Sequence, residues 1–98
     1  MAQDNADFRR ALSDVLGRDE VRRLHEAVTA ALASGQRVIL DASAVAHVEM
    51  IGWAWLAHLR RQARLLDQPV EITNPSPALI QAAKACGCLP LLDGSELD

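Results

Sequence analysis

Aromatic side chains are scarce in the 98-residue sequence, which contains one phenylalanine, two tryptophans and no tyrosine. Hydrophobic residues nevertheless make up 50% of the chain, so we expect a core of Leu, Val, Ile and Ala. This apolar content excludes an intrinsically disordered chain. The length suits one domain. We expect a single domain over residues 1–98, folded at about 8–93, with loose termini at 1–7 and 94–98.

An excess of positive charge is missing too, because the formal net charge is −3. Nucleic-acid-binding domains usually show a strongly basic face, and no nucleic-acid partner is therefore expected. No uncharged apolar run approaches the roughly 20 residues that span a bilayer. Residues 1–7 lack the basic start and the apolar stretch of a signal peptide. The sequence thus predicts a cytoplasmic protein without direct membrane insertion.

Sequence motifs that carry chemistry are absent. The glycines form neither a phosphate-binding G-x-G-x-x-G loop nor a G-x-S-x-G elbow. The three histidines lack the spacing of metal ligands. His25 is expected at the surface or its boundary, and His58 in the core or at an interface. We therefore expect no enzymatic activity, no cofactor and no metal site.

Two minor enzymatic alternatives stay open. His47 lies two residues before Glu49, and a His–Glu pair can act in acid–base catalysis. Cys86 and Cys88 flank one glycine, and such a pair can bind a soft metal or change its redox state. A structural disulfide between residues two apart is geometrically awkward, and two ligands alone do not make a metal site.

The spacing of apolar residues predicts alternating strands and helices. This order predicts an α/β fold, with a small mixed, mostly parallel sheet of about four strands packed with helices. We expect Ile39, Trp55 and Leu59 to be buried together, with Ile39 facing the second helix. Ser76 is expected to cap the third helix. The predicted strands are 8–12, 37–41, 70–73 and 89–92, with a further short extended piece at 45–48, and the predicted helices are 19–32, 50–66 and 77–86.

Both tryptophans lie on the second predicted helix, where residues two apart point about 200° apart. Trp55 is expected on the apolar face with Ile51, and Trp53 cannot share that face. Trp53 therefore packs at the margin of the sheet or lies at the surface. In the second case it would mark a partner site together with Met50.

The stretch VILDASAVAHVEMIG, residues 38–52, resembles the central motif of STAS domains, the anti-sigma factor antagonists and their relatives. In that motif a strand ends in Asp, a short apolar strand follows, and Asp-Ser-Ser-Gly or Asp-Thr-Ala-Gly begins a helix. Residues 12–16 match the L-x-G-x-L segment of the family, and 74–77 and 86–89 match its later turns. The resemblance covers about residues 8–93 and implies a STAS-like fold.

The resemblance also implies a role and its site. Glu49 occupies the acidic position before the phosphoacceptor, and Met50 occupies the position of the phosphorylated Ser or Thr. Methionine has no hydroxyl, so the charge of about −1.5 to −2 that phosphorylation adds is unavailable at this position. The implied role is a non-enzymatic protein-interaction module in bacterial signalling. Its expected partner-binding residues are Glu49, Met50, Ile51, Gly52 and Trp53, together with Ser43.

Three partner classes follow from the resemblance. The family default is an anti-sigma factor or another regulatory protein kinase, and a chemosensory protein is similar in kind. The third class is the ATPase of an ABC lipid transporter, because the STAS subunit of the Mla system is similarly short. A homodimer also stays open.

Because Asp14 replaces the common glycine and the front end is short, the first family strand is expected to be reduced or missing.

Overall fold

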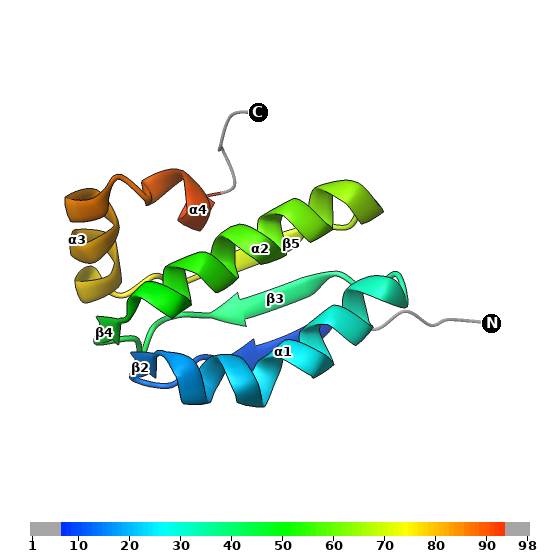
Figure 1. Cartoon of the computed structure of the whole chain (residues 1–98), viewed down its shortest axis with the longest axis horizontal. Coiled ribbons are helices and arrows are strands. Elements are labelled where there is room, and N and C mark those ends of the chain that lie inside the picture. Colours follow the sequence, from blue (N-terminus) through cyan, green and yellow to red (C-terminus); the bar gives the residue numbers. More distant parts are fainter. Residues whose placement is uncertain (1–6, 94–98) are drawn as a thin grey trace.

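The computed structural model describes residues 7–93, so the predicted loose termini, apart from Asp7, lie outside the described residues. Strands and helices follow one another almost as predicted, and the fold is α/β (Figure 1). The elements are β1 (Phe8–Ala11), β2 (Val15–Leu16), α1 (Arg18–Ala33), β3 (Val38–Asp41), β4 (His47–Val48), α2 (Met50–Leu66), β5 (Val70–Thr73), α3 (Pro77–Cys86) and α4 (Leu89–Asp93).

The main sheet has three strands in the order β1-β3-β5, with both pairs parallel, and β2 and β4 form a second parallel pair. The strand predicted at 8–12 is confirmed as β1, and the expectation that the first family strand is reduced or missing stays a prediction. All four residues of β1 pair with β3. The N–H of Phe8 donates to the carbonyl of Arg37 and the N–H of Leu12 to that of Asp41, which extends the pairing at both ends.

Helices α1 and α2 lie side by side over one face of the main sheet (Figure 1). Val38 and Leu40 are fully buried in the core beneath them, and Trp55 and Leu59 are buried in the same cluster as predicted. Ile39 is also buried but does not belong to that cluster. Side chains alternate along a strand, so Ile39 lies on the opposite face of the sheet, and the prediction that it faces α2 is wrong.

The segment predicted as a last strand, 89–92, is the short helix α4. Pro90 lacks the N–H that a strand ladder needs and suits a first helical turn. Arg60 of α2 fixes this helix in place. Its guanidinium donates to the carbonyls of Leu91 (2.9 Å) and Leu92 (3.1 Å), and also to that of Val70 on β5.

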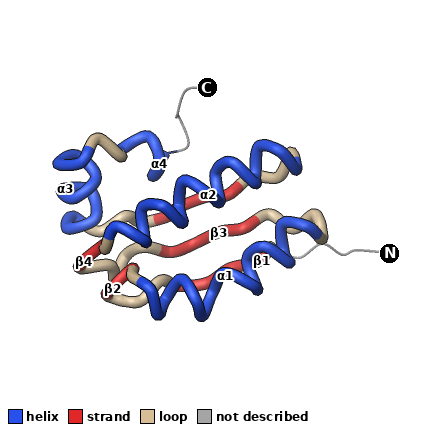
Figure 2. Tube along the Cα trace, viewed as in Figure 1, coloured by secondary structure: helices blue, strands red, loops and turns tan. Residues whose placement is uncertain are grey.

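The shorter elements lie at the carboxyl end of the main sheet. Both β2 and β4 lie there, with α3 next to β4, and α1 and α2 both begin at this end (Figure 2). The predicted cap of α3 is confirmed, because the Ser76 hydroxyl accepts the Leu79 N–H at 3.0 Å and donates to the carbonyl of Val45. Across residues 7–93, no helix combines the length and the apolar character that a membrane crossing requires.

Candidate partner-binding site

The segment that leads into α2 is held by backbone hydrogen bonds to β2 and to Asp14, the residue before it. The N–H groups of Ala46 and His47 donate to the carbonyl of Asp14 at 2.7 and 3.0 Å, and the N–H of Glu49 donates to that of Leu16 at 3.0 Å. Glu49 is the N-cap residue of α2, although its side chain makes no capping bond. The first turn of α2 therefore starts from a fixed position against β2.

Gly52 brings this turn close to β2. A Cβ at this position would overlap the carbonyl oxygen of Leu16 and would lie 3.0 Å from side-chain atoms of Leu16 and Val48. No larger residue fits without a shift of the backbone. The structure thus places Gly52 in the interior, where it sets the distance between α2 and β2.

Two large hydrophobic side chains just before Gly52 are exposed. Met50 is 83% exposed and Ile51 is 41% exposed, while the buried face of α2 runs from Gly52 through Trp55, Leu56 and Leu59. The expectation that Ile51 shares the apolar face with Trp55 is wrong, because the buried face is rotated by part of a turn. Among residues 7–92, six large hydrophobic side chains are exposed, and four of them lie on α2: Met50, Ile51, Leu65 and Leu66.

Trp53 takes an intermediate position between the two alternatives that the sequence left open. It is partly buried and packs against the core cluster. Its neighbour Ala54 is exposed. We call the residues Glu49, Met50, Ile51 and Trp53 the α2 start, which presents one exposed, one half-exposed and one partly buried large apolar side chain from a fixed backbone.

The side chain of Glu49 lies over Gly17, at the edge of a depression of about 540 Å³. Sequence reasoning missed Glu20, which lines this depression and is buried, with 5% of its surface exposed. Its carboxylate accepts the Ser13 N–H at 2.8 Å and two bonds from Arg23 at 3.0 and 2.9 Å. Acidic residues are common in the first turn of a helix, so no sequence signal sets Glu20 apart.

Ser43 lies apart from this turn, in the loop after β3. Its N–H donates to the carboxylate of Asp41 at 2.9 Å, and the Ser43 hydroxyl adds a second bond. These bonds hold the pKa of Asp41 below its usual 3.8. Ser43 itself is exposed, and none of the hydrogen bonds within residues 7–92 joins it to the α2 start.

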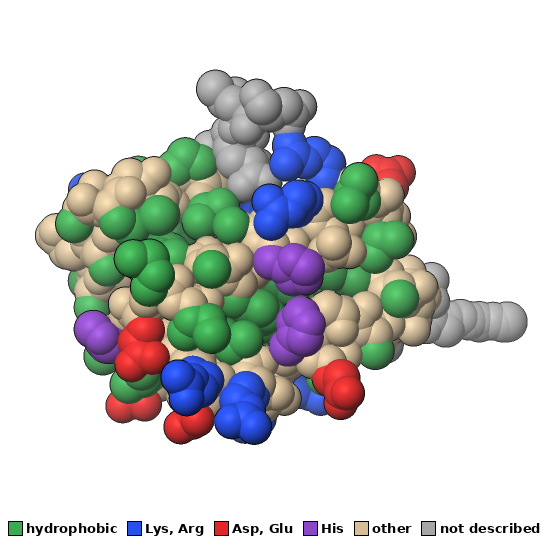
Figure 3. Space-filling model, in the orientation of Figure 1, with side chains coloured by type: hydrophobic (Ala, Val, Ile, Leu, Met, Phe, Trp, Pro, Cys, Tyr) green, Lys and Arg blue, Asp and Glu red, His purple; other side chains and the backbone are tan. Residues whose placement is uncertain are grey.

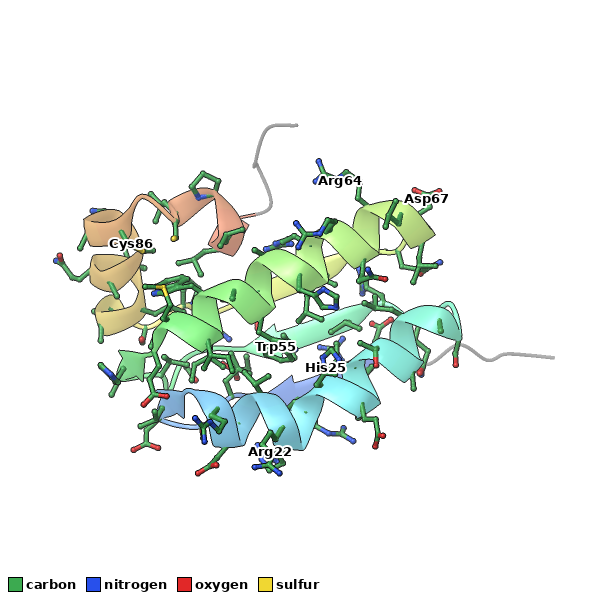
Figure 4. The ribbon with its side chains drawn as sticks, in the orientation of Figure 1. Arg22, His25, Trp55, Arg64, Asp67 and Cys86 are labelled. Carbon is green, nitrogen blue, oxygen red and sulfur yellow. The ribbon has the colours of Figure 1, made fainter. Side chains whose placement is uncertain are left out.

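His25 and His58 meet between α1 and α2, with ring centroids 5.6 Å apart. The indole N–H of Trp55 donates to Nδ1 of His25 at 3.2 Å (Figure 4). This bond engages the lone pair of His25 at Nδ1. No cluster of three metal-ligating side chains occurs in the part of the chain that the structure describes.

Three of the four residues of the two enzymatic alternatives lie on the surface. His47 and Glu49 are exposed, and no hydrogen bond within the described residues joins their side chains. Cys86 is exposed at the end of α3, and Cys88 is partly buried beyond Gly87. A hydrogen bond with Cys86, together with burial, raises the pKa of Cys88 to about 11, which disfavours the thiolate that redox or metal chemistry requires.

Comparison of the sequence with known protein families finds a match. A family model described as an MlaB-type STAS domain matches residues 2–92. A search of curated proteins finds no match to the chain. The matched range includes the α2 start and every element from β1 to α3.

Proposed function

We propose a function for the chain from one premise: it belongs to the STAS domain family, as the match over residues 2–92 shows. The chain is a non-enzymatic interaction module that binds a partner protein through the α2 start. Met50 carries this proposal, because a large apolar side chain that is 83% exposed on a fixed helical turn suits a contact surface. Methionine side chains also adapt readily to a partner surface.

The positions of the candidate catalytic groups support a non-enzymatic role. His47 and Glu49 are exposed to solvent, and His25 already accepts the hydrogen bond of Trp55. The raised pKa of Cys88 keeps its thiol protonated.

Control of binding by phosphorylation at the usual position is not available to this chain, because Met50 has no hydroxyl. Ser43 is exposed, whereas Ser76 is buried with its hydroxyl bonded on both sides. We therefore propose that the chain binds its partner constitutively or that the partner controls the complex. Treatment with a cognate serine kinase and ATP should leave the intact mass unchanged.

Two classes of partner protein are alternatives for this surface. The resemblance to anti-sigma factor antagonists supports a regulatory kinase, an anti-sigma factor or a chemosensory protein. The description of the matching family model supports the second class, the ATPase of an ABC lipid transporter. The purified chain can be mixed with a purified candidate of each class and run on a size-exclusion column. The candidate that co-elutes with the chain identifies the partner class.

Replacement of Met50 by Glu tests the site itself. The change puts a charge at the centre of the contact without filling any space in the core, so we expect at least tenfold weaker partner binding, about 1.4 kcal/mol. The matched control is Leu89→Glu, at a half-exposed leucine on α4. Equal affinity of both variants and the wild type in titration calorimetry would place the partner elsewhere on the chain.

A further inference from the structure

A shallow groove runs between α1 and α2, directly beside the α2 start. Its volume is about 370 Å³. The indole of Trp55, which is 4% exposed, forms part of its wall, and Ile51 joins it to the α2 start. The lining consists of Val21 and His25 from α1, and of Ile51, Ala54, Trp55 and His58 from α2.

A band of basic and imidazole side chains borders this groove. Figure 3 shows two neighbouring histidine side chains with Lys or Arg side chains above and below them, next to a green apolar area. Arg22 and His25 lie three residues apart on α1, and His58 and Arg61 lie three apart on α2, a spacing that puts each pair on one helix face. Arg22 and Arg61 are exposed.

The charge of α2 has a single sign. Between Met50 and Leu66 the charged residues are Arg60, Arg61 and Arg64, with no Asp or Glu, although the whole chain has a net charge of −3. Arg60 is bound to backbone carbonyls. Within residues 7–92, Arg61 and Arg22 form no ion pair, so their charges face solvent.

We propose that the groove and its basic band bind an acidic amphipathic helix of the partner protein. The inference rests on the proposed function and names the class of partner segment that the site accepts. An apolar side chain of the segment enters the groove over Trp55, as in other helix-in-groove complexes. Carboxylates one turn further along the segment meet the guanidinium groups of Arg22 and Arg61, which pair with carboxylates in a bidentate geometry.

A protein segment fits this surface better than an anionic membrane. A flat lipid surface over the groove would also meet the exposed carboxylates of Glu26 and Glu49, and the protein as a whole is acidic. A second copy fits less well too. A twofold-symmetric contact brings the same patch of both copies together. The basic bands of the two copies would then face and repel each other.

The test uses labelled peptides of roughly 15 residues, long enough for four helical turns. The first peptide has Leu on one helical face and Glu on the other, the second has Lys in place of Glu, and the third has Ala in place of Leu. We expect fluorescence anisotropy to show binding of the first peptide alone, weakened by added salt. Amide shifts in NMR spectra should map to Val21, Ile51 and Ala54.

Charge reversal supplies the matched comparison. The double variant Arg22→Glu/Arg61→Glu should bind the acidic peptide at least tenfold more weakly. Lys84→Glu, at an exposed position in the last turn of α3, should bind it as the wild type does. Circular dichroism confirms that each variant is folded before its affinity is compared.

Several results would overturn the inference: no binding of the acidic peptide, equal binding of the Lys peptide, an unchanged affinity of the double variant, or amide shifts on another surface. Binding to anionic vesicles that the double variant abolishes, without peptide binding, would assign the band to a membrane. If the partner complex is lost with Met50→Glu but keeps its affinity in the double variant, the groove is excluded and the proposed function stands. If neither Met50→Glu nor the double variant weakens the partner complex, both the groove inference and the proposed function are wrong.

Discussion

The carbonyl oxygen of Leu16 occupies the place that a Cβ on Gly52 would need. This contact joins β2 to the first turn of α2, and it fixes the backbone that presents Met50 and Ile51 to solvent. A glycine inside a helix normally lowers stability relative to alanine. Here the glycine is required, because α2 approaches β2 too closely for any side chain at that point.

We predict that Gly52→Ala destabilises the protein by about 1–3 kcal/mol, because the new methyl group overlaps backbone that cannot move freely. Helix propensity alone predicts the opposite sign, a gain of about 1 kcal/mol. Urea unfolding followed by circular dichroism separates the two. A stabilised variant would show that α2 does not rest on Leu16.

Two leucines on α2 test which face of the helix is buried. Leu59 has no exposed surface, whereas Leu65 is 74% exposed. We predict that Leu59→Ala costs about 2–5 kcal/mol of unfolding free energy. Leu65→Ala, the same change on the same helix, should stay within about 0.5 kcal/mol of the wild type. Similar costs for the two variants would contradict the assigned face.

The two cysteines should react at different rates. With a pKa of about 11, roughly one Cys88 thiol in a thousand is ionised at pH 8, and Cys88 is also partly buried, whereas Cys86 is exposed. We therefore expect iodoacetamide to modify Cys86 first, as read by peptide mass spectrometry. Cys86→Ser should remove the fast phase. Faster modification of Cys88 would contradict the hydrogen bond that raises its pKa.

Acid should weaken the turn after β3. Ser43 lowers the pKa of Asp41 below 3.8 in the folded state, so the charged carboxylate stabilises the fold above that pH. The contribution is lost as the pH falls through the lowered pKa of the folded state. We predict that Asp41→Asn is less stable than the wild type near neutral pH and that the difference shrinks in acid below pH 3.8. A constant difference across this range in urea unfolding would show that Asp41 does not act through its charge.

Much of the fold can be predicted from the sequence, because apolar spacing and turn residues act locally. The strands around Ile39 and Ile72 and the helices around Leu24 and Leu59 lie where these patterns place them. The side of the sheet that Ile39 faces could not be predicted. Alternation says that Ile39 lies opposite Val38 and Leu40, but only the position of α1 and α2 decides which face they cover.

Local patterns also failed where a distant residue decides. The leucines after Cys88 fit a strand as well as a helix, and Arg60, about thirty residues earlier, holds them as α4. The family motif indicates Met50 as a partner-binding residue, whereas the burial of Gly52 depends on contact with β2. The meeting of His25 with His58 depends on the packing of two helices and leaves no trace in their spacing.

The central claim, that the α2 start contacts the partner, is tested most directly by site-specific photo-crosslinking. A benzophenone amino acid placed at Met50 should crosslink to the partner protein in the assembled complex. The same amino acid at Leu89, on the separate helix α4, should not. Crosslinks from position 89 without crosslinks from position 50 would contradict the account.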